Sequence, residues 1–184
     1  MPIRNTTARW GSLAQLFHWV IVALIITQFT LATLSASLPL GMAKLAMLAR
    51  HKSVGITILA LAVLRLTWRL MNPAPPLPNT LKPYERMLAH VSHFALYALL
   101  FLMPLTGWAM SSARKYPVSW FSLVQLPDFV APNRALYDIL HTTHAVLAWT
   151  LVGVAVLHAA AAFKHHFVLK DDVLRRMLPF TRTR

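Results

Sequence analysis

The chain has 184 residues, of which 57% are hydrophobic and only 12% are charged, and its mean hydropathy is +0.55. Soluble domains carry roughly 25% charged residues, so an ordinary water-soluble globule is excluded. Cysteine is absent, which excludes disulfides, thiolate metal sites, iron–sulfur clusters and covalent CxxCH haem attachment. The net charge is +13, but the basic residues mostly lie between apolar runs, so they indicate a membrane partner and no nucleic acid.

Four apolar stretches are long enough to cross a bilayer, which takes about 20 helical residues. In chain order they cover about 13–36, 51–70, 87–111 and 139–163. Because lipid offers the backbone no hydrogen-bond partner, these spans are predicted to be helices. The chain is therefore predicted to form a single transmembrane domain over residues 1–184. Its predicted fold class is all-α, an integral membrane antiparallel four-helix bundle.

Two connections between the spans stand out by composition. The segment 72–83 holds five prolines and is predicted to be an extended surface loop. The longest connection, 114–138, carries Trp120, Phe121 and Phe129. Aromatic residues are enriched at membrane–water interfaces, so we expect a loop or a short helix lying in the interface on one side.

The basic residues fall unevenly on the two sides of this topology. If the N-terminus is inside, twelve Lys and Arg lie on the cytoplasmic side and six on the opposite side. Because cytoplasmic segments are enriched in Lys and Arg, both termini are predicted to be cytoplasmic.

Nine histidines are present, and most fall inside the spans or at their ends. Ionisable groups within a membrane are costly and usually functional. Carboxylates, which would suit a proton relay or a hard-metal site, are missing from all four apolar runs. Imidazole without thiolate, in a helical bundle, suits b-type haem held by two histidines per iron.

The depth of the histidines predicts how they pair. His144 and His158 are 14 residues apart on the fourth span, so they point to one side of the helix at levels about 21 Å apart. His18 lies five residues inside the first span and is level with His158. His51 opens the second span on the side where His144 lies. The predicted iron ligands are therefore His18 with His158, and His51 with His144.

The other five histidines leave alternatives open. His90 and His93 compete with His18 as ligands of the inner haem, and His141 lies one turn from His144. His165 and His166 follow the fourth span. The competing interpretation for all five is hydrogen bonding to haem propionates, lipid headgroups or a quinone. For any single histidine taken alone, a packing or interfacial role is the more common one.

The chain contains an ordered set of short motifs that extends from about Arg9 to Pro179. The motifs are FHW at 17–19, HKSVG at 51–55, RLTWRL at 65–70, APPLP at 74–78, AHVSH at 89–93, LMPLTGW at 102–108, HTTH at 141–144, LHAAAAFKHHF at 157–167 and KDDVLRRMLP at 170–179. With these motifs the chain resembles the bacterial cytochrome b561 family of di-haem, quinone-linked membrane cytochromes, which includes superoxide oxidases.

The resemblance implies two haem b groups bound through four histidines. The family's ligand positions correspond here to His18, His51, His144 and His158. It also implies electron transport across the inner membrane of a bacterium, with ubiquinone as electron acceptor and superoxide as electron donor. The quinone is expected near His90, His93 or His165 on the inner side. Segment 112–138 matches the family pattern least.

Several cations are candidates for supporting roles. Arg65 follows His51 by 14 residues, so it shares a helix face with His51 at the level of the inner haem, where it is predicted to bind a propionate. The alternative, favoured for Arg69, is that the side chain extends to cytoplasmic headgroups. Arg50 and Lys52 flank His51 and are expected to attract an anionic donor or to anchor the helix end.

Two other functions remain open at this stage. One is an electron-transfer subunit that serves a partner redox protein and has no substrate of its own. The other is a histidine-lined transporter for a transition metal or protons, which the lack of intramembrane carboxylates disfavours. An absorption spectrum with reduced b-type bands separates the haem proteins from the transporter.

Overall fold

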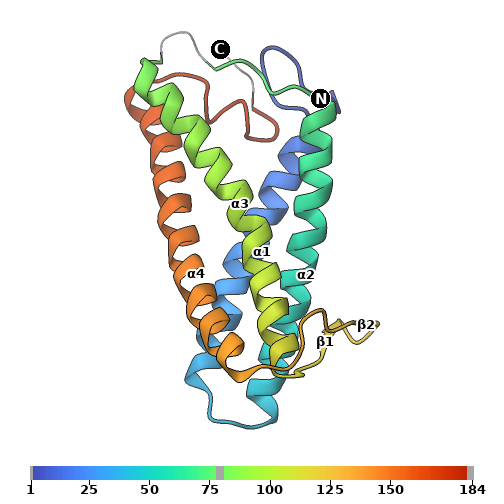
Figure 1. Cartoon of the computed structure of the whole chain (residues 1–184). Helices are drawn as coiled ribbons and strands as arrows, with labels where there is room; N and C mark the ends of the chain where they lie inside the picture. The colour runs from blue at the N-terminus through green and yellow to red at the C-terminus, as the bar shows by residue number, and fades with distance from the viewer. Residues whose placement is uncertain (1, 78–80, 182–184) are drawn as a thin grey trace. The chain divides into compact units, whose positions relative to one another are not determined.

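The computed structural model describes residues 2–77 and 81–181, and four long helices make up most of this part of the chain (Figure 1). The helices are α1 (Ser12–Ser37), α2 (Met42–Met71), α3 (Pro83–Ala113) and α4 (Arg134–Phe163). A π-helix, η1 (Lys164–Val168), continues α4, and the strands β1 (Val118–Trp120) and β2 (Val124–Leu126) lie between α3 and α4. All four long helices are apolar and long enough to cross a membrane. The predicted all-α membrane four-helix bundle is confirmed.

The helices are longer than the apolar spans that predict them. α2 begins at Met42 rather than near 51, and α4 begins at Arg134 rather than near 139. The added residues of α2 include Met, Ala, Leu, Lys and Arg, which are strong helix formers. Their helix propensity therefore explains why α2 extends beyond the residues needed to cross the hydrocarbon core.

Residues at the starts of α3 and α4 define where these helices begin. α3 starts at Pro83, which suits the first helical position because its missing N–H has no partner there anyway. Glu85 accepts a hydrogen bond from the Lys82 backbone N–H at 3.2 Å, which is one half of a capping box. Asn133 caps α4, since its side-chain oxygen accepts the Leu136 N–H at 2.9 Å.

The chain divides into two compact units, and every long helix contributes one part to each. We call the first the terminal unit, because it holds both chain ends: Met1–Val20, Val63–Ala98 and Thr150–Arg184. The second is the hairpin unit, which holds both strands: Ile21–Ala62 and Leu99–Trp149.

In the terminal unit, the N-terminal and C-terminal segments are held together by hydrogen bonds at the same end of the unit (Figure 1). Arg9 donates to the Thr181 and Leu178 carbonyl oxygens, and Trp10 N–H donates to the Arg176 carbonyl oxygen. The buried Gln15 side chain also donates to Arg176, at 3.1 Å. These contacts fasten the C-terminal segment to the start of α1.

The hairpin unit has an apolar core formed by Ile21, Val54, Ile58, Ala62 and Leu100. β1 and β2 pair in antiparallel fashion, with Ser119 opposite Gln125. Ser53 of α2 binds the hairpin, because its hydroxyl donates to the Ser119 carbonyl oxygen at 2.9 Å and accepts the Phe121 N–H at 3.0 Å. Where the sequence predicts a loop or a short helix, the connection contains a β-hairpin bound to α2, because its backbone groups pair with each other and with Ser53.

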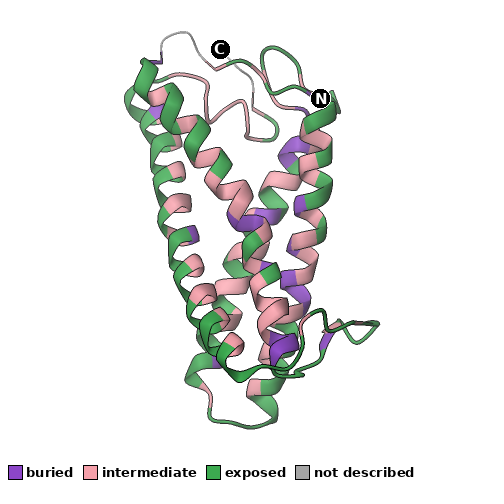
Figure 2. Cartoon of the chain, viewed as in Figure 1, coloured by how far each residue is buried: buried purple, intermediate pink, exposed green. Residues whose placement is uncertain are grey.

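Few side chains of the long helices are buried, although the helices are apolar (Figure 2). Leu151 is the one buried residue that the described part of α4 contributes. Large apolar side chains such as Ile26, Phe94 and Trp149 are 63%, 77% and 73% exposed. Such a surface suits contact with lipid, since water disfavours apolar patches of this extent.

Candidate functional site

The terminal unit brings His18 of α1 and His158 of α4 together, and we call these residues the terminal pair. Their ring centroids are 6.4 Å apart, with an angle of 73° between the ring planes. Both side chains are half-buried. The pair joins the first and last long helices of the chain, 140 residues apart in sequence.

The hairpin unit brings His51 of α2 and His144 of α4 together as a second pair, the hairpin pair. Its ring centroids are 6.3 Å apart, and the planes again make an angle of 73°. Both rings are half-buried. The two pairs thus have nearly the same geometry, although their surroundings differ.

The separation within each pair fits two imidazoles bound on opposite sides of one metal ion. Two metal–nitrogen bonds of about 2.0 Å, added to the distances from each nitrogen to its ring centre, place the centroids about 6.3 Å apart. The observed values of 6.4 and 6.3 Å agree with this requirement. The four histidines that the sequence predicts therefore fit the axial ligation of two haem irons.

His93 of α3 is a third imidazole near the terminal pair. Its ring centroid is 5.3 Å from that of His158, with a plane angle of 63°. This separation is about 1 Å too short for two rings on opposite sides of one metal ion. His93 is therefore placed as a neighbour of the site, whereas His18 has the separation that a ligand of the same iron needs.

Thr106 orients the ring of His144 in the hairpin pair. Its hydroxyl oxygen lies 3.0 Å from His144 Nδ1, and 2.8 Å from the Leu102 carbonyl oxygen. The hydroxyl proton is donated to the backbone, so the oxygen can accept the Nδ1–H of His144. The lone pair of Nε2 is then left for a metal. Metal-bound histidines commonly donate their other ring N–H in this way.

Gly107 leaves space for the same ring. A Cβ atom at this position would lie 3.1 Å from Cε1 of His144, closer than ordinary van der Waals contact. A residue without a side chain at position 107 therefore lets the imidazole of His144 approach the α3 backbone. Thr106, the residue directly before this glycine, is a functional residue that the sequence pattern does not predict.

Arg65 lies close to the terminal pair. On α1 it contacts Ala14, which lies one turn before His18. Its Nε donates to the Tyr97 hydroxyl oxygen at 3.2 Å, and Nη1 donates to the Ala14 carbonyl oxygen at 3.4 Å. Half-buried near two imidazoles, Arg65 has the position that a partner of a haem carboxylate requires.

The cations next to His51 differ in how they are held. Lys52 is half-buried, donates to the Pro117 carbonyl oxygen at 3.1 Å, and lies 5.7 Å from the Tyr116 ring. Arg50 is exposed. Of the two, Arg50 has the greater freedom to interact with a soluble anion.

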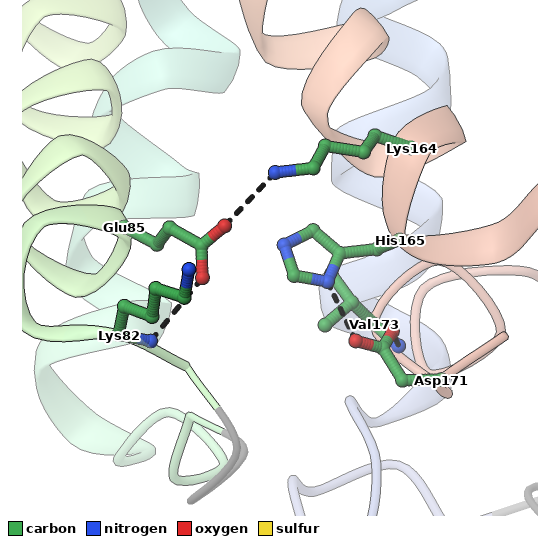
Figure 3. A network of polar contacts seen from close by, with 6 residues as sticks. All are labelled: Lys82, Glu85, Lys164, His165, Asp171 and Val173. Carbon is green, nitrogen blue, oxygen red and sulfur yellow. Dashed lines mark hydrogen bonds and ion pairs between the residues drawn. The ribbon is translucent and has the colours of Figure 1, made fainter. Parts of the chain in front are cut away.

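His165 forms the shortest polar contact near the end of α4 (Figure 3). Its Nδ1 lies 2.6 Å from an Asp171 carboxylate oxygen, and the residue is only 9% exposed. The second Asp171 oxygen accepts the Val173 N–H at 3.0 Å. Next to it, Lys164 forms an ion pair of 2.9 Å with Glu85, which joins the end of α4 to the start of α3.

The remaining histidines lie nearer the surface. His90 is exposed and lines a shallow groove with Arg86, Met87 and Val91. His141 is exposed and stacks on Tyr137, with the ring centroids 5.9 Å apart. His166 is half-buried and makes an edge contact with the neighbouring Phe167 ring at 4.8 Å.

Four membrane helices that place imidazoles in pairs at metal-binding separation define a membrane cytochrome of the b type. Residues 9–180 match the family described as prokaryotic cytochrome b561, so the chain belongs to that family. Its members are haem b proteins that transfer electrons in membranes, which confirms the expected cytochrome class.

Curated relatives support this assignment over most of the chain. "Cytochrome b561 homolog 2" of Escherichia coli (strain K12) is 36% identical over 181 residues, which cover 97% of this chain and 95% of the relative. "Probable superoxide oxidase CybB" of Yersinia pestis is 35% identical and covers 88% of this chain and 91% of the relative. "Cytochrome b561 homolog 1" of E. coli is 28% identical over 166 residues.

Proposed function

We propose that the chain binds two haem b groups and carries electrons from superoxide to a quinone. His18 and His158 hold one haem, and His51 and His144 hold the other. The observation that carries this proposal is the agreement of both ring separations, 6.4 and 6.3 Å, with axial ligation of one iron by two imidazoles. Bound haem supplies one-electron redox chemistry, while the chain supplies the ligands, burial and charge that tune it.

The orientation follows from the distribution of the basic residues. Twelve of the eighteen Lys and Arg lie on the side of the two termini, so both termini are assigned to the cytoplasm of a bacterial inner membrane. The hairpin pair then serves the outer side, and the terminal pair serves the inner side. Superoxide formed outside the membrane meets the hairpin unit, whose exposed Arg50 and Arg114 attract anions.

The reaction balances with two electron donors for each acceptor. Two superoxide anions give up one electron each and become two molecules of dioxygen. One quinone takes up the two electrons and two protons and becomes the quinol. Superoxide as the donor is supported by the name of the Yersinia relative, a probable superoxide oxidase. Quinone as the acceptor is what the sequence motifs imply through their resemblance to quinone-linked cytochromes.

His165 is the residue best suited to serve the quinone. Its contact of 2.6 Å with Asp171 holds Nδ1, so Nε2 remains for a quinone oxygen (Figure 3). A histidine backed by a carboxylate is an effective proton donor when charge develops on an oxygen. His93 lies beside the terminal pair, and His90 lines the nearby groove of α3, so both remain candidate contacts of the quinone.

The experiment measures haem content and turnover with the purified protein. We expect two b-type haems per chain, about one after His158→Ala or His144→Ala, and quinone reduction on addition of superoxide. His141→Ala is the matched control, because this exposed histidine on α4 stacks on Tyr137 and should leave both haems bound. A colourless protein contradicts the proposal. Haem reduction by superoxide without quinone turnover instead favours a subunit that passes electrons to a partner protein.

A further inference from the structure

One tyrosine of the terminal unit contacts two arginines. The guanidinium carbons of Arg65 and Arg69 lie 5.7 and 5.5 Å from the Tyr97 ring centroid. Arg65 also donates its Nε–H to the Tyr97 hydroxyl oxygen at 3.2 Å. Arg69 lies 5.7 Å from the Trp10 ring as well, so aromatic faces from α3 and the N-terminal segment hold it. Cation–π contacts of this kind stabilise a half-buried guanidinium.

Neither arginine has an acidic partner in the part of the chain that the structure describes. The ion pairs found there join Lys164 with Glu85, His165 with Asp171, and Arg175 with Asp172. Two like charges around one ring repel each other, and half-burial within membrane helices adds a desolvation cost. The arrangement therefore suits an anion from outside the chain.

The free donors of this cluster identify the class of anion. A guanidinium has five N–H donors, and Arg65 uses two of them, on Tyr97 and on the Ala14 carbonyl oxygen. Among residues 2–77 and 81–181, Arg69 makes ring contacts and no hydrogen bond, and the Tyr97 hydroxyl donates its own proton to none of them. A carboxylate only accepts hydrogen bonds and matches the planar guanidinium.

We infer that Tyr97 is a positioning residue of the terminal-pair site. Its hydroxyl fixes Arg65 and its ring fixes Arg69, so that both guanidinium groups can bind carboxylates of the bound haem. The inference rests on the proposed function and extends it. It assigns a role to Tyr97, and it places Arg69 in the haem site, where the sequence favoured an interaction with lipid headgroups. Arg65 is already placed there by its hydrogen bond to the Ala14 carbonyl oxygen, one turn before His18 on α1.

The role has a measurable consequence for the reduction potential. A fixed positive charge near the iron favours the reduced form, so Arg65 raises the potential of the terminal-pair haem. Without the Tyr97 hydroxyl, the Arg65 side chain is free to turn toward water, where its charge is screened. Tyr97→Phe should therefore lower this potential, by less than Arg65→Met does, and should leave the potential of the hairpin-pair haem unchanged.

The test is a spectroelectrochemical titration of purified holoprotein carrying Tyr97→Phe, Arg65→Met or both substitutions. If Tyr97 acts through Arg65, the double variant shifts the potential no further than Arg65→Met alone. Haem release to apomyoglobin gives a second measurement and should be faster for the terminal-pair haem in each variant. The His158→Ala variant, which retains the hairpin-pair haem, shows which potential belongs to which site.

Tyr137→Phe is the matched control. The Tyr137 ring lies 4.7 Å from the Arg114 guanidinium, and its hydroxyl makes no hydrogen bond among the contacts of the described residues. It should therefore leave both potentials unchanged. An unchanged potential in Tyr97→Phe, or additive shifts in the double variant, overturns the role of Tyr97 and leaves the haem ligands as proposed. Wild-type protein without haem overturns the proposed function and this inference together.

Discussion

The terminal pair and the hairpin pair hold their imidazoles at almost the same separation but support them differently. In the hairpin unit, Thr106 hydrogen-bonds to His144 and Gly107 leaves space for its ring. In the terminal unit, a third imidazole lies beside His158, and Arg65 contacts α1 at Ala14, one turn before His18. One pair is oriented by a neutral hydrogen bond and close packing, whereas the other lies in a field of positive charge.

This difference bears on the proposed function. There each iron would be held by two histidines, so the ligands alone would provide no difference in reduction potential. The charge of Arg65 near the terminal pair would favour an electron there, and the Thr106 hydrogen bond would increase the basicity of His144. Electrons are therefore expected to settle at the terminal pair, in the unit that also holds His165.

The largest expected effect comes from removing one ligand of each pair. His18→Ala should remove the terminal-pair haem and His51→Ala the hairpin-pair haem, because a single axial histidine holds a b-type haem much more weakly than two. Haem per chain by the pyridine haemochrome assay should fall from two to about one in each variant. The same loss on His93→Ala would mean that His93, and not His18, is the ligand.

Thr106→Val should weaken the hairpin pair alone. Losing the partner of a metal-bound histidine typically costs about 10- to 100-fold in metal affinity, and we expect a similar increase in the rate of haem release to apomyoglobin. Thr106→Ser keeps the hydroxyl and should restore retention. Thr27→Val is the matched control, since the Thr27 hydroxyl bonds the Ala23 carbonyl oxygen in its own helix. Equal release rates in Thr106→Val and wild type would contradict the orienting role.

Gly107→Ala should have a smaller effect on the same pair. The new Cβ atom would approach His144 Cε1 to 3.1 Å, so the ring must move by a few tenths of an ångström. We expect partial loss of the hairpin-pair haem and a changed low-spin signal in electron paramagnetic resonance. Gly153→Ala is the control, because an added Cβ there meets nothing within 4 Å. Full occupancy and an unchanged signal in Gly107→Ala would show that the close approach is harmless.

The sequence predicts the helices and the meeting of the histidines because both follow from simple geometry. Long apolar runs in lipid must be helical, and equal depth on antiparallel spans brings His18 to His158 and His51 to His144. Whether these rings bind iron stays a prediction. The orientation of the chain in the membrane stays one as well.

The supporting residues could not be found in this way. A threonine in an apolar helix usually bonds its own backbone, as Thr27, Thr30 and Thr33 do, so nothing in its spacing marks Thr106 as different. Tyr97 and Arg65 are 32 residues apart on different helices, and their contact depends on side-chain directions. The hairpin has strands of three residues, too short for a recognisable alternation of polar and apolar side chains.

The smallest expected effect concerns the cations beside the hairpin pair. The exposed Arg50 is free to attract superoxide, while Lys52 is bound to the Pro117 carbonyl oxygen. Arg50→Gln should therefore slow haem reduction by superoxide roughly two- to threefold at low ionic strength and flatten its salt dependence, with a weaker effect for Lys52→Gln. Arg86→Gln, an exposed charge of the terminal unit, is the control and should change neither. A salt dependence of the reduction rate that is unchanged in Arg50→Gln would exclude steering by this residue. An effect of Arg86→Gln would instead place the reaction with superoxide at the terminal unit.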